Sequence, residues 1–270
     1  MSTRGPASAP PGTQLIFRTL DVAECFVTED ELGISEIARM AKLSPSTAHR
    51  IVRALVARGY LEQDAGTDRY HLGRSVVLLG QAVRSRFGLD RVLPILEELS
   101  ASSGESVNLG MLDGDEVVVA MRVASQQALR FDQPVGSRIK VHCSSMGKAL
   151  LAFGAPNGPA ELGDIELLPM TPATITSLDD FSAEIDEVRA KGYSRDREEG
   201  IVGVSCIGAP VFDSLGRNIA AIAMQGPTAR MSEDRVADLL PEVLRTAGAV
   251  SAAMRLDASS DSASRRTSAG

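Results

Sequence analysis

Residues 44–58 read SPSTAHRIVRALVAR, and they carry more structural information than any other segment of the chain. Ser44 is a strong N-cap, and Pro45 suits the first helical position because its missing N–H has no helical partner there. The apolar side chains that follow recur at helical spacing as one stripe: Ala48, Ile51, Val52, Leu55 and Val56. The opposite side carries Ser46, Arg50 and Arg53, flanked by Thr47 and His49. The segment therefore predicts an amphipathic helix with an outer face of hydroxyl and guanidinium groups.

The residues before this helix predict two more helices. Residues 14–27 have apolar side chains at helical spacing, and Ser35 is placed to cap a short helix with Glu36 in its first turn. Leu43 and Ser44 then make a tight connection to the next helix. Two short helices joined by a tight turn, the second with exposed polar side chains, are typical of a helix-turn-helix.

The residues after it predict a β-hairpin. Residues 59–63 and 69–72 alternate between apolar and polar side chains around a turn at 64–68, which places Arg69 near the tip. A hairpin after the recognition helix is a wing. The order of elements over residues 14–74 is thus typical of a winged helix-turn-helix that binds double-stranded DNA.

The charge distribution favours contact with nucleic acid in this part of the chain. The chain has a net charge of −7, but residues 37–86 hold nine basic side chains against three acidic ones, a local charge of +6. Such a segment can meet phosphates, although a solvated basic face explains the charge equally well. The candidate DNA contacts are Ser35, Ser46, Thr47, His49, Arg50, Arg53 and Arg69.

The rest of the chain predicts a linker helix at 75–88 and a larger domain at 89–256. Helical patterns at 91–102, 145–153, 181–191 and 234–254 alternate with strand-like ones at 107–111, 117–123, 128–131, 193–195, 205–211 and 219–224. Strand pairs close in sequence predict an α+β domain on an antiparallel sheet. Residues 1–13 and 257–270 are expected to be disordered tails because of their Pro-, Ser- and Ala-rich composition.

Several of these segments together resemble the IclR family of transcription regulators. In the N-terminal part they are residues 35–38, 43–50, 55–61 and 70–73; in the C-terminal part they are 104–109, 112–118, 142–152, 198–213 and 226–227. The resemblance spans about residues 15–256 and implies a GAF-like effector-binding domain. It implies ligand contacts at Ser145, Met146, Gly147, Asp196, Cys206 and Met224, with Phe131 and Gln225 as walls.

The chain departs from the family pattern at two places. The family often has Pro-Lys-Ser-Thr at the start of the recognition helix, where this chain has Ser44-Pro45-Ser46-Thr47 and so lacks one basic contact. Gln225 precedes Gly226-Pro227 where the family usually has a small residue such as serine. The longer amide is expected to narrow the pocket or change its polarity.

The residues around Ser145 support a binding site independently of the resemblance. Residues 144–147 open a predicted helix, and the first backbone N–H groups of a helix lack internal partners and attract negative charge. A carboxylate or carbonyl suits that position. Cys206 and Met224 also fit buried strands, Asp196 could be a surface residue, and Ser145 and Gly147 could simply start a helix.

The sequence argues against other classes. No apolar run is long enough to span a membrane, three scattered cysteines make no disulfide framework, and the three histidines share no metal-ligand spacing. Gly147-Lys148 lacks the following Ser or Thr of a P-loop, and the glycines around Ser205 do not have nucleophile-elbow spacing. We therefore expect a protein that is not an enzyme, with no cofactor or metal, in the cytoplasm.

The function that these observations predict is ligand-controlled transcription regulation. A homodimer or tetramer would read a pseudo-palindromic operator, since the symmetry of a dimer is mirrored in two half-sites. A small metabolite such as an organic acid would bind the C-terminal domain and change DNA affinity. The alternative is a sensor or enzyme whose helix-turn-helix mediates protein contacts instead.

Overall fold

The computed structural model describes residues 12–155, 158–159 and 161–267. The chain divides between Arg84 and Ser85 into two compact units, near the C-terminal end of the helix that the sequence predicted as a linker. Most of the predicted N-terminal tail, residues 1–11, lies outside the described residues. No helix in the described ranges has the length and apolar character needed to cross a membrane.

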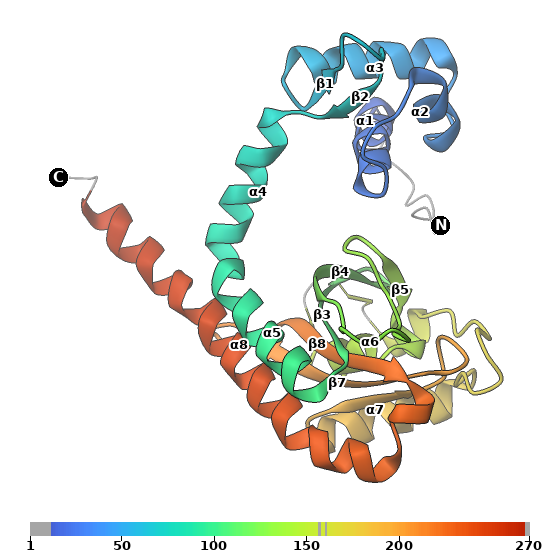
Figure 1. Ribbon diagram of the computed structural model, residues 1–270, viewed down its shortest axis with the longest axis vertical. Helices are drawn as coiled ribbons and strands as arrows, with labels where there is room; N and C mark the ends of the chain where they lie inside the picture. Colours follow the sequence, from blue (N-terminus) through green and yellow to red (C-terminus); the bar gives the residue numbers. More distant parts are fainter. Residues whose placement is uncertain (1–11, 156–157, 160, 268–270) are drawn as a thin grey trace. The chain divides into compact units, whose positions relative to one another are not determined.

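The N-terminal unit has the order of elements predicted from the sequence (Figure 1). Its elements are α1 (Gln14–Glu24), the 3-10 turn η1 (Cys25–Val27), α2 (Ile34–Met40), α3 (Pro45–Ala57), β1 (Leu61–Gln63), β2 (Tyr70–Leu72) and α4 (Arg74–Phe87). β1 and β2 pair antiparallel, with Leu61 opposite Leu72. Leu32 adds an isolated antiparallel bridge to β2, because its N–H and C=O exchange hydrogen bonds of 3.0 and 2.9 Å with Tyr70. The unit is a winged helix-turn-helix.

Of the two predicted helix caps in this unit, the cap of α3 is confirmed and the cap of α2 is wrong. Ser44 caps α3 as predicted, since its Oγ accepts the N–H of Thr47 at 3.3 Å. The predicted cap of α2 is wrong. That helix is capped at Gly33, whose N–H donates to Glu36 Oε2 at 2.7 Å, and Ser35 is an exposed residue of its first turn.

The C-terminal unit is an α+β domain built on an antiparallel sheet, as predicted. Its helices and turns are α5 (Leu89–Ser103), η2 (Val141–Cys143), α6 (Ser145–Ala152), η3 (Leu162–Asp164), α7 (Leu178–Lys191), η4 (Thr228–Arg230) and α8 (Glu233–Thr267). Its strands are β3 (Ser106–Asp113), β4 (Glu116–Val123), β5 (Arg138–Lys140), β6 (Ser194–Arg197), β7 (Val204–Phe212) and β8 (Asn218–Pro227). Among the described residues these strands form one sheet in the order β5-β4-β3-β8-β7-β6.

Helices cover both faces of this sheet (Figure 1). α5 and α8 pack on one face over side chains such as Val107, Leu109, Ile207 and Met224. α6 and α7 pack on the other, where Ala221 and Ala223 of β8 face them. Because strand side chains alternate between faces, each position along β7 and β8 belongs to one layer or the other. This alternation decides which residues can reach a site under α6.

Two predicted segments differ from the structure. Residues 128–131, expected as a strand, form an irregular stretch between β4 and β5. Side chains from elsewhere hold the backbone of this stretch, since the Ser106 hydroxyl donates to Phe131 O at 3.1 Å and the Arg230 guanidinium to Leu129 O at 2.9 Å. Residues 257–267, expected within a disordered tail, continue α8, and no Gly or Pro interrupts the chain there. Residues 268–270 lie outside the described range.

Candidate functional site

The outer face of α3 presents polar side chains to solvent. Ala48, Ile51, Val52 and Leu55 are buried in the core of the unit, as the apolar stripe predicted. The opposite side chains, Ser46, His49, Arg50 and Arg53, are exposed, and Thr47 is half-buried beside them. Within the described ranges neither Arg50 nor Arg53 has an ion-pair partner in its own chain. The fold thus displays two guanidinium groups that it does not use internally.

Arg69, a predicted DNA contact, is paired within its own unit and remains 39% exposed. Its guanidinium donates to Glu36 Oε2 at 2.8 Å and to the backbone oxygen of Glu31 at 2.9 Å. The same Glu36 carboxylate accepts the N–H of Gly33, and that hydrogen bond, ahead of the Arg69 charge, holds the pKa of Glu36 below its usual range. Arg69 therefore fastens the hairpin to the start of α2, and its charge is largely satisfied before any DNA arrives.

The C-terminal unit contains a small cleft beside α6. It encloses about 370 Å³ of empty space, which includes its opening to solvent. The residues that line it come from α6 and the turn before it, from β5, β6, β7 and β8, and from the loops after β4 and β6: Phe131, Gln133, Ile139, Cys143, Ser144, Ser145, Met146, Asp196, Gly200, Ile201, Val204, Cys206, Ala223 and Gln225. The cleft combines an aromatic and aliphatic lining with a few polar groups, which is the usual character of a small-molecule site.

Six of the eight predicted effector contacts line this cleft: Phe131, Ser145, Met146, Asp196, Cys206 and Gln225. Met224 does not. It is fully buried on the opposite face of β8 with the core under α5 and α8, because its neighbours Ala223 and Gln225 occupy the cleft face. Gly147 also lies outside the lining, where a Cβ would clash with the backbone of Val141. Its absent side chain serves the packing of α6 on η2.

The start of α6 has two backbone donors left for a ligand. Ser144 caps the helix, accepting the Gly147 N–H on its Oγ at 3.0 Å and the Lys148 N–H on its carbonyl at 3.0 Å. Ser145 and Met146 are the first two helical residues, whose N–H groups have no helical acceptor. Both residues line the cleft, so these donors lie at its edge.

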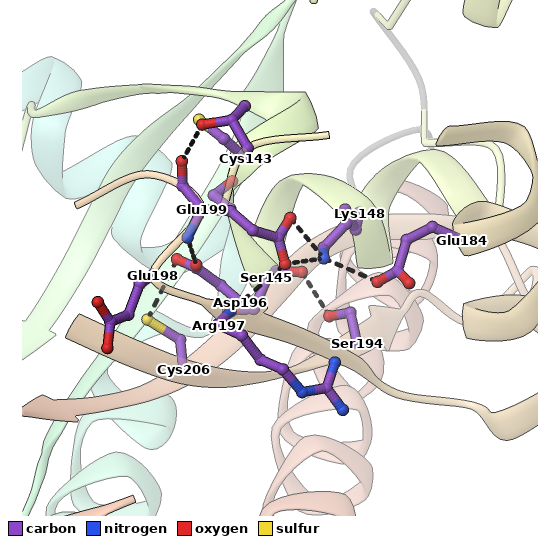
Figure 2. Close-up of polar contacts among 12 residues, drawn as sticks. Cys143, Ser145, Lys148, Glu184, Ser194, Asp196, Arg197, Glu198, Glu199 and Cys206 are labelled. Carbon is purple, nitrogen blue, oxygen red and sulfur yellow. Dashed lines mark hydrogen bonds and ion pairs between the residues drawn. The ribbon is translucent and has the colours of Figure 1, made fainter. Parts of the chain in front are cut away.

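Asp196 is the principal polar group of the cleft. Its carboxylate accepts the Glu199 N–H on Oδ1 at 2.8 Å and the Cys206 thiol on Oδ2 at 3.7 Å (Figure 2). Burial, followed by the negative charge of Glu199, raises the pKa of Asp196 to about 6. Burial also raises the pKa of the Cys143 thiol to about 12 and that of Cys206 well above its ordinary value. The two thiols therefore stay protonated at neutral pH, which suits binding and not nucleophilic chemistry.

A buried lysine positions Glu199, the residue whose backbone N–H binds Asp196. The Nζ of Lys148 is fully buried and lies 2.7 Å from both Glu184 Oε1 and Glu199 Oε1 (Figure 2). The Glu199 carbonyl in turn accepts the Thr174 hydroxyl at 2.6 Å. Glu199 is thereby fixed at its side chain and its backbone, so its N–H points at Asp196 in a rigid frame.

The sequence missed several residues of this site. Gln133, Ile139, Cys143, Ser144, Gly200, Ile201, Val204 and Ala223 line the cleft without having been predicted. Ala223 could have been found from strand alternation, since it lies two residues before Gln225. The loop residues carried no such signal. In the described part of the chain no group of three or more His, Cys, Asp or Glu side chains is arranged to hold a metal ion.

Comparison with known proteins agrees with both units. The model of the IclR helix-turn-helix domain matches residues 15–65, and that of the C-terminal domain of the bacterial transcriptional regulator IclR matches residues 82–252. The HTH-type transcriptional regulator BhcR of Paracoccus denitrificans is 35% identical over 90% of this chain and 88% of its own length.

Solved structures give the same assignment. IclR of Thermotoga maritima has a TM-score of 0.68 at 26% identity, covering 88% of this chain and 98% of its own. An IclR homologue of Microbacterium hydrocarbonoxydans, solved in complex with 4-hydroxybenzoate, has a TM-score of 0.74 at 27% identity, covering 89% and 98%. Such proteins are regulators and not enzymes. This chain belongs to the IclR family and is a DNA-binding transcriptional regulator whose activity is modulated by a small-molecule effector.

Proposed function

We propose that this regulator grips each half of a pseudo-palindromic operator with α3 and that an organic effector in the cleft beside α6 changes its affinity for that operator. The observation that carries the DNA-binding part is the outer face of α3. Arg50 and Arg53 are exposed and have no ion-pair partner in the described chain, so both are free to meet phosphates or guanine edges. Ser46, Thr47 and His49 are placed to add contacts near the start of the helix, and Ser35 to add one from α2.

Reading two half-sites requires at least two copies of the chain, and the N-terminal unit has apolar surface for such an assembly. Leu15, Ile16 and Leu20 of α1 are between 52% and 60% exposed. On α4, Val77, Leu78, Leu79 and Val83 are between 49% and 66% exposed. Apolar side chains grouped on two helices of a small domain are typical of a surface that another protein covers. We propose that a second copy covers them, in a homodimer or a tetramer that acts in the cytoplasm.

The proposed effector is a small organic acid. The N–H groups of Ser145 and Met146 suit a carboxylate or carbonyl, and Phe131 and Met146 supply apolar contacts. A structural relative binds 4-hydroxybenzoate, which has a carboxylate, a hydroxyl and an apolar ring. Coupling between effector and DNA sites is typically 1–3 kcal/mol, or roughly 5- to 150-fold in operator affinity.

Selection from sheared genomic DNA of the source organism tests the proposal. The full-length protein is incubated with the fragments at two salt concentrations, and the bound DNA is sequenced. We expect enrichment of a two-fold symmetric site that survives the higher salt, because non-specific phosphate contacts weaken steeply with salt. The genes beside that site then define a set of metabolites to test for release of the DNA. Enrichment of single, unpaired half-sites would contradict the symmetric operator.

A further inference from the structure

Three residues of the cleft lie in one row across the sheet. Asp196 on β6 pairs with Cys206 on β7, and Cys206 pairs with Gln225 on β8. All three side chains line the cleft. Neighbouring strands are about 4.8 Å apart, so the backbones of Asp196 and Gln225 are separated by roughly 10 Å across this row. The cleft therefore has an Asp196 end and a Gln225 end.

Gln225 has a buried donor with nothing to bind. Its side-chain amide is 3% exposed, and Nε2 has no hydrogen-bond partner among the described residues. Native structures rarely leave such a buried donor unpaired without a functional reason. Since the amide lines the cleft, a bound molecule with an acceptor oxygen can satisfy it.

The other polar groups near Gln225 are already engaged. The Ser106 hydroxyl, on the strand beside Gln225, donates to the backbone oxygen of Phe131 at 3.1 Å. Gln133, on the opposite wall, accepts the Asn108 amide at 3.1 Å. Both contacts hold the loop that carries Phe131 and Gln133 over the cleft. Of the side chains that line the cleft, Gln225 is the one with a buried polar atom that has no partner among the described residues, so it adds a side-chain donor to the N–H groups of Ser145 and Met146.

The Asp196 end of the cleft offers a hydrogen-bond acceptor, whereas the Gln225 end offers a donor. Asp196 is the only carboxylate in the lining, and the lining contains no Lys or Arg. The buried cation Lys148 is held by Glu184 and Glu199. A carboxylate of a ligand is therefore repelled from the Asp196 end, whereas a hydroxyl there can donate to Asp196.

We propose that Gln225 sets the orientation and the chemical class of the effector. This inference rests on the proposed effector role of the cleft. The ligand accepts a hydrogen bond from Gln225 Nε2 through a carboxylate or carbonyl oxygen and donates one to Asp196 through a hydroxyl. The two groups lie two strands apart, which favours a rigid hydroxy acid whose hydroxyl and carboxylate are well separated over one that has them on adjacent carbons.

Three probes and three variants of the full-length protein test this. The probes are 4-hydroxybenzoate with both groups, benzoate with the acceptor alone and phenol with the donor alone, each titrated calorimetrically. Gln225→Met removes the amide at similar volume, and Gln225→Glu keeps an acceptor but replaces the donor with a charge. Gln126→Glu adds the same charge at an exposed position outside the cleft lining and serves as the control.

We expect the wild-type protein to bind 4-hydroxybenzoate at least tenfold more tightly than phenol or benzoate. Gln225→Met should lose the advantage over phenol, a weakening of roughly 10- to 100-fold, while it keeps the advantage over benzoate. Gln225→Glu should weaken 4-hydroxybenzoate further, because two carboxylates then face each other. Gln126→Glu should resemble wild type. The far-ultraviolet circular dichroism spectrum should be the same in all variants, which shows that they are folded.

Three results would overturn the proposal. If Gln225→Met weakens 4-hydroxybenzoate and phenol equally, Gln225 only shapes the cleft. If Gln225→Glu binds as well as wild type, the group facing the ligand is an acceptor. If none of the probes binds the wild-type protein, the ligand class is wrong, whereas the effector role of the cleft is then judged separately by whether other metabolites release operator DNA.

Discussion

The polar side chains of α3 and those around the cleft are held in opposite ways. On α3, Arg50 and Arg53 are exposed and unpaired within the described chain, so the fold has no need of them. Around the cleft, Lys148 and Asp196 are buried and bound by neighbours on other elements. The difference indicates that the surface proposed to bind DNA can change with little cost to stability, whereas the proposed effector site is part of the hydrogen-bonding framework of its domain.

The largest effect should follow from the loss of the buried cation. Lys148→Met leaves the carboxylates of Glu199 and Glu184 facing each other without a positive charge, and unpaired buried charges cost about 3–5 kcal/mol. We expect the free energy of unfolding of the C-terminal domain to fall by that amount, measured by guanidinium denaturation followed by circular dichroism.

Lys191→Met is the matched control for Lys148→Met. Lys191 also pairs with a glutamate, Glu187, but both side chains are about half exposed, at 49% and 54%. Water replaces such a partner, so stability should hardly change. If the two variants were equally stable, the contrast between exposed and buried charges drawn above would be wrong.

A smaller effect, dependent on pH, should follow from neutralising Asp196. Its pKa is about 6 in the folded protein, above the ordinary value of 3.8, so folding favours the protonated form. Its contribution to stability is then fully present below about pH 4 and is lost as the pH rises through 6. Two pKa units correspond to roughly 2–3 kcal/mol. Asp196→Asn should therefore be more stable than wild type at pH 8, with the difference vanishing near pH 4 in thermal unfolding. Parallel pH profiles would contradict the buried position of this carboxylate.

An effect on binding alone should follow from changes on α3. Arg50→Ala or Arg53→Ala should weaken operator binding by roughly 10- to 100-fold if the side chain contacts a base, and should reduce the salt dependence by about one ion if it contacts phosphate. Neither should alter thermal stability. Arg74→Ala removes one exposed charge from α4 and should change affinity much less. If both α3 variants bound the operator with wild-type affinity, the proposed contact between α3 and the operator would be wrong.

The sequence predicted the surroundings of a side chain correctly where these depend on nearby residues. It did not predict contacts between segments that are distant in the sequence. The stripe of α3 and the cap at Ser44 depend only on residues within one helix, and both are confirmed. The sequence did not predict the contact of Arg69 with Glu36, because two residues 33 positions apart cannot be placed side by side from spacing. Met224 and Gln225 were both assigned to the effector, although adjacent strand residues face opposite sides. Strand alternation excludes one of such a pair, and only the structure shows which.

The smallest effect separates stability from DNA binding at a single residue. Ser44→Ala removes the cap of α3 and should cost about 1 kcal/mol of stability. Ser44→Asp keeps a cap and adds a negative charge that the helix dipole favours, so stability should equal or exceed wild type. The same charge stands at the start of the helix proposed to enter the major groove, where it would repel phosphates, most strongly at low salt. Ser44→Asp should therefore fold as well as wild type and yet bind its operator several-fold more weakly. Equal operator affinity at low salt would mean that the start of α3 does not approach the DNA, and would leave Arg50 and Arg53 to act from farther along the helix.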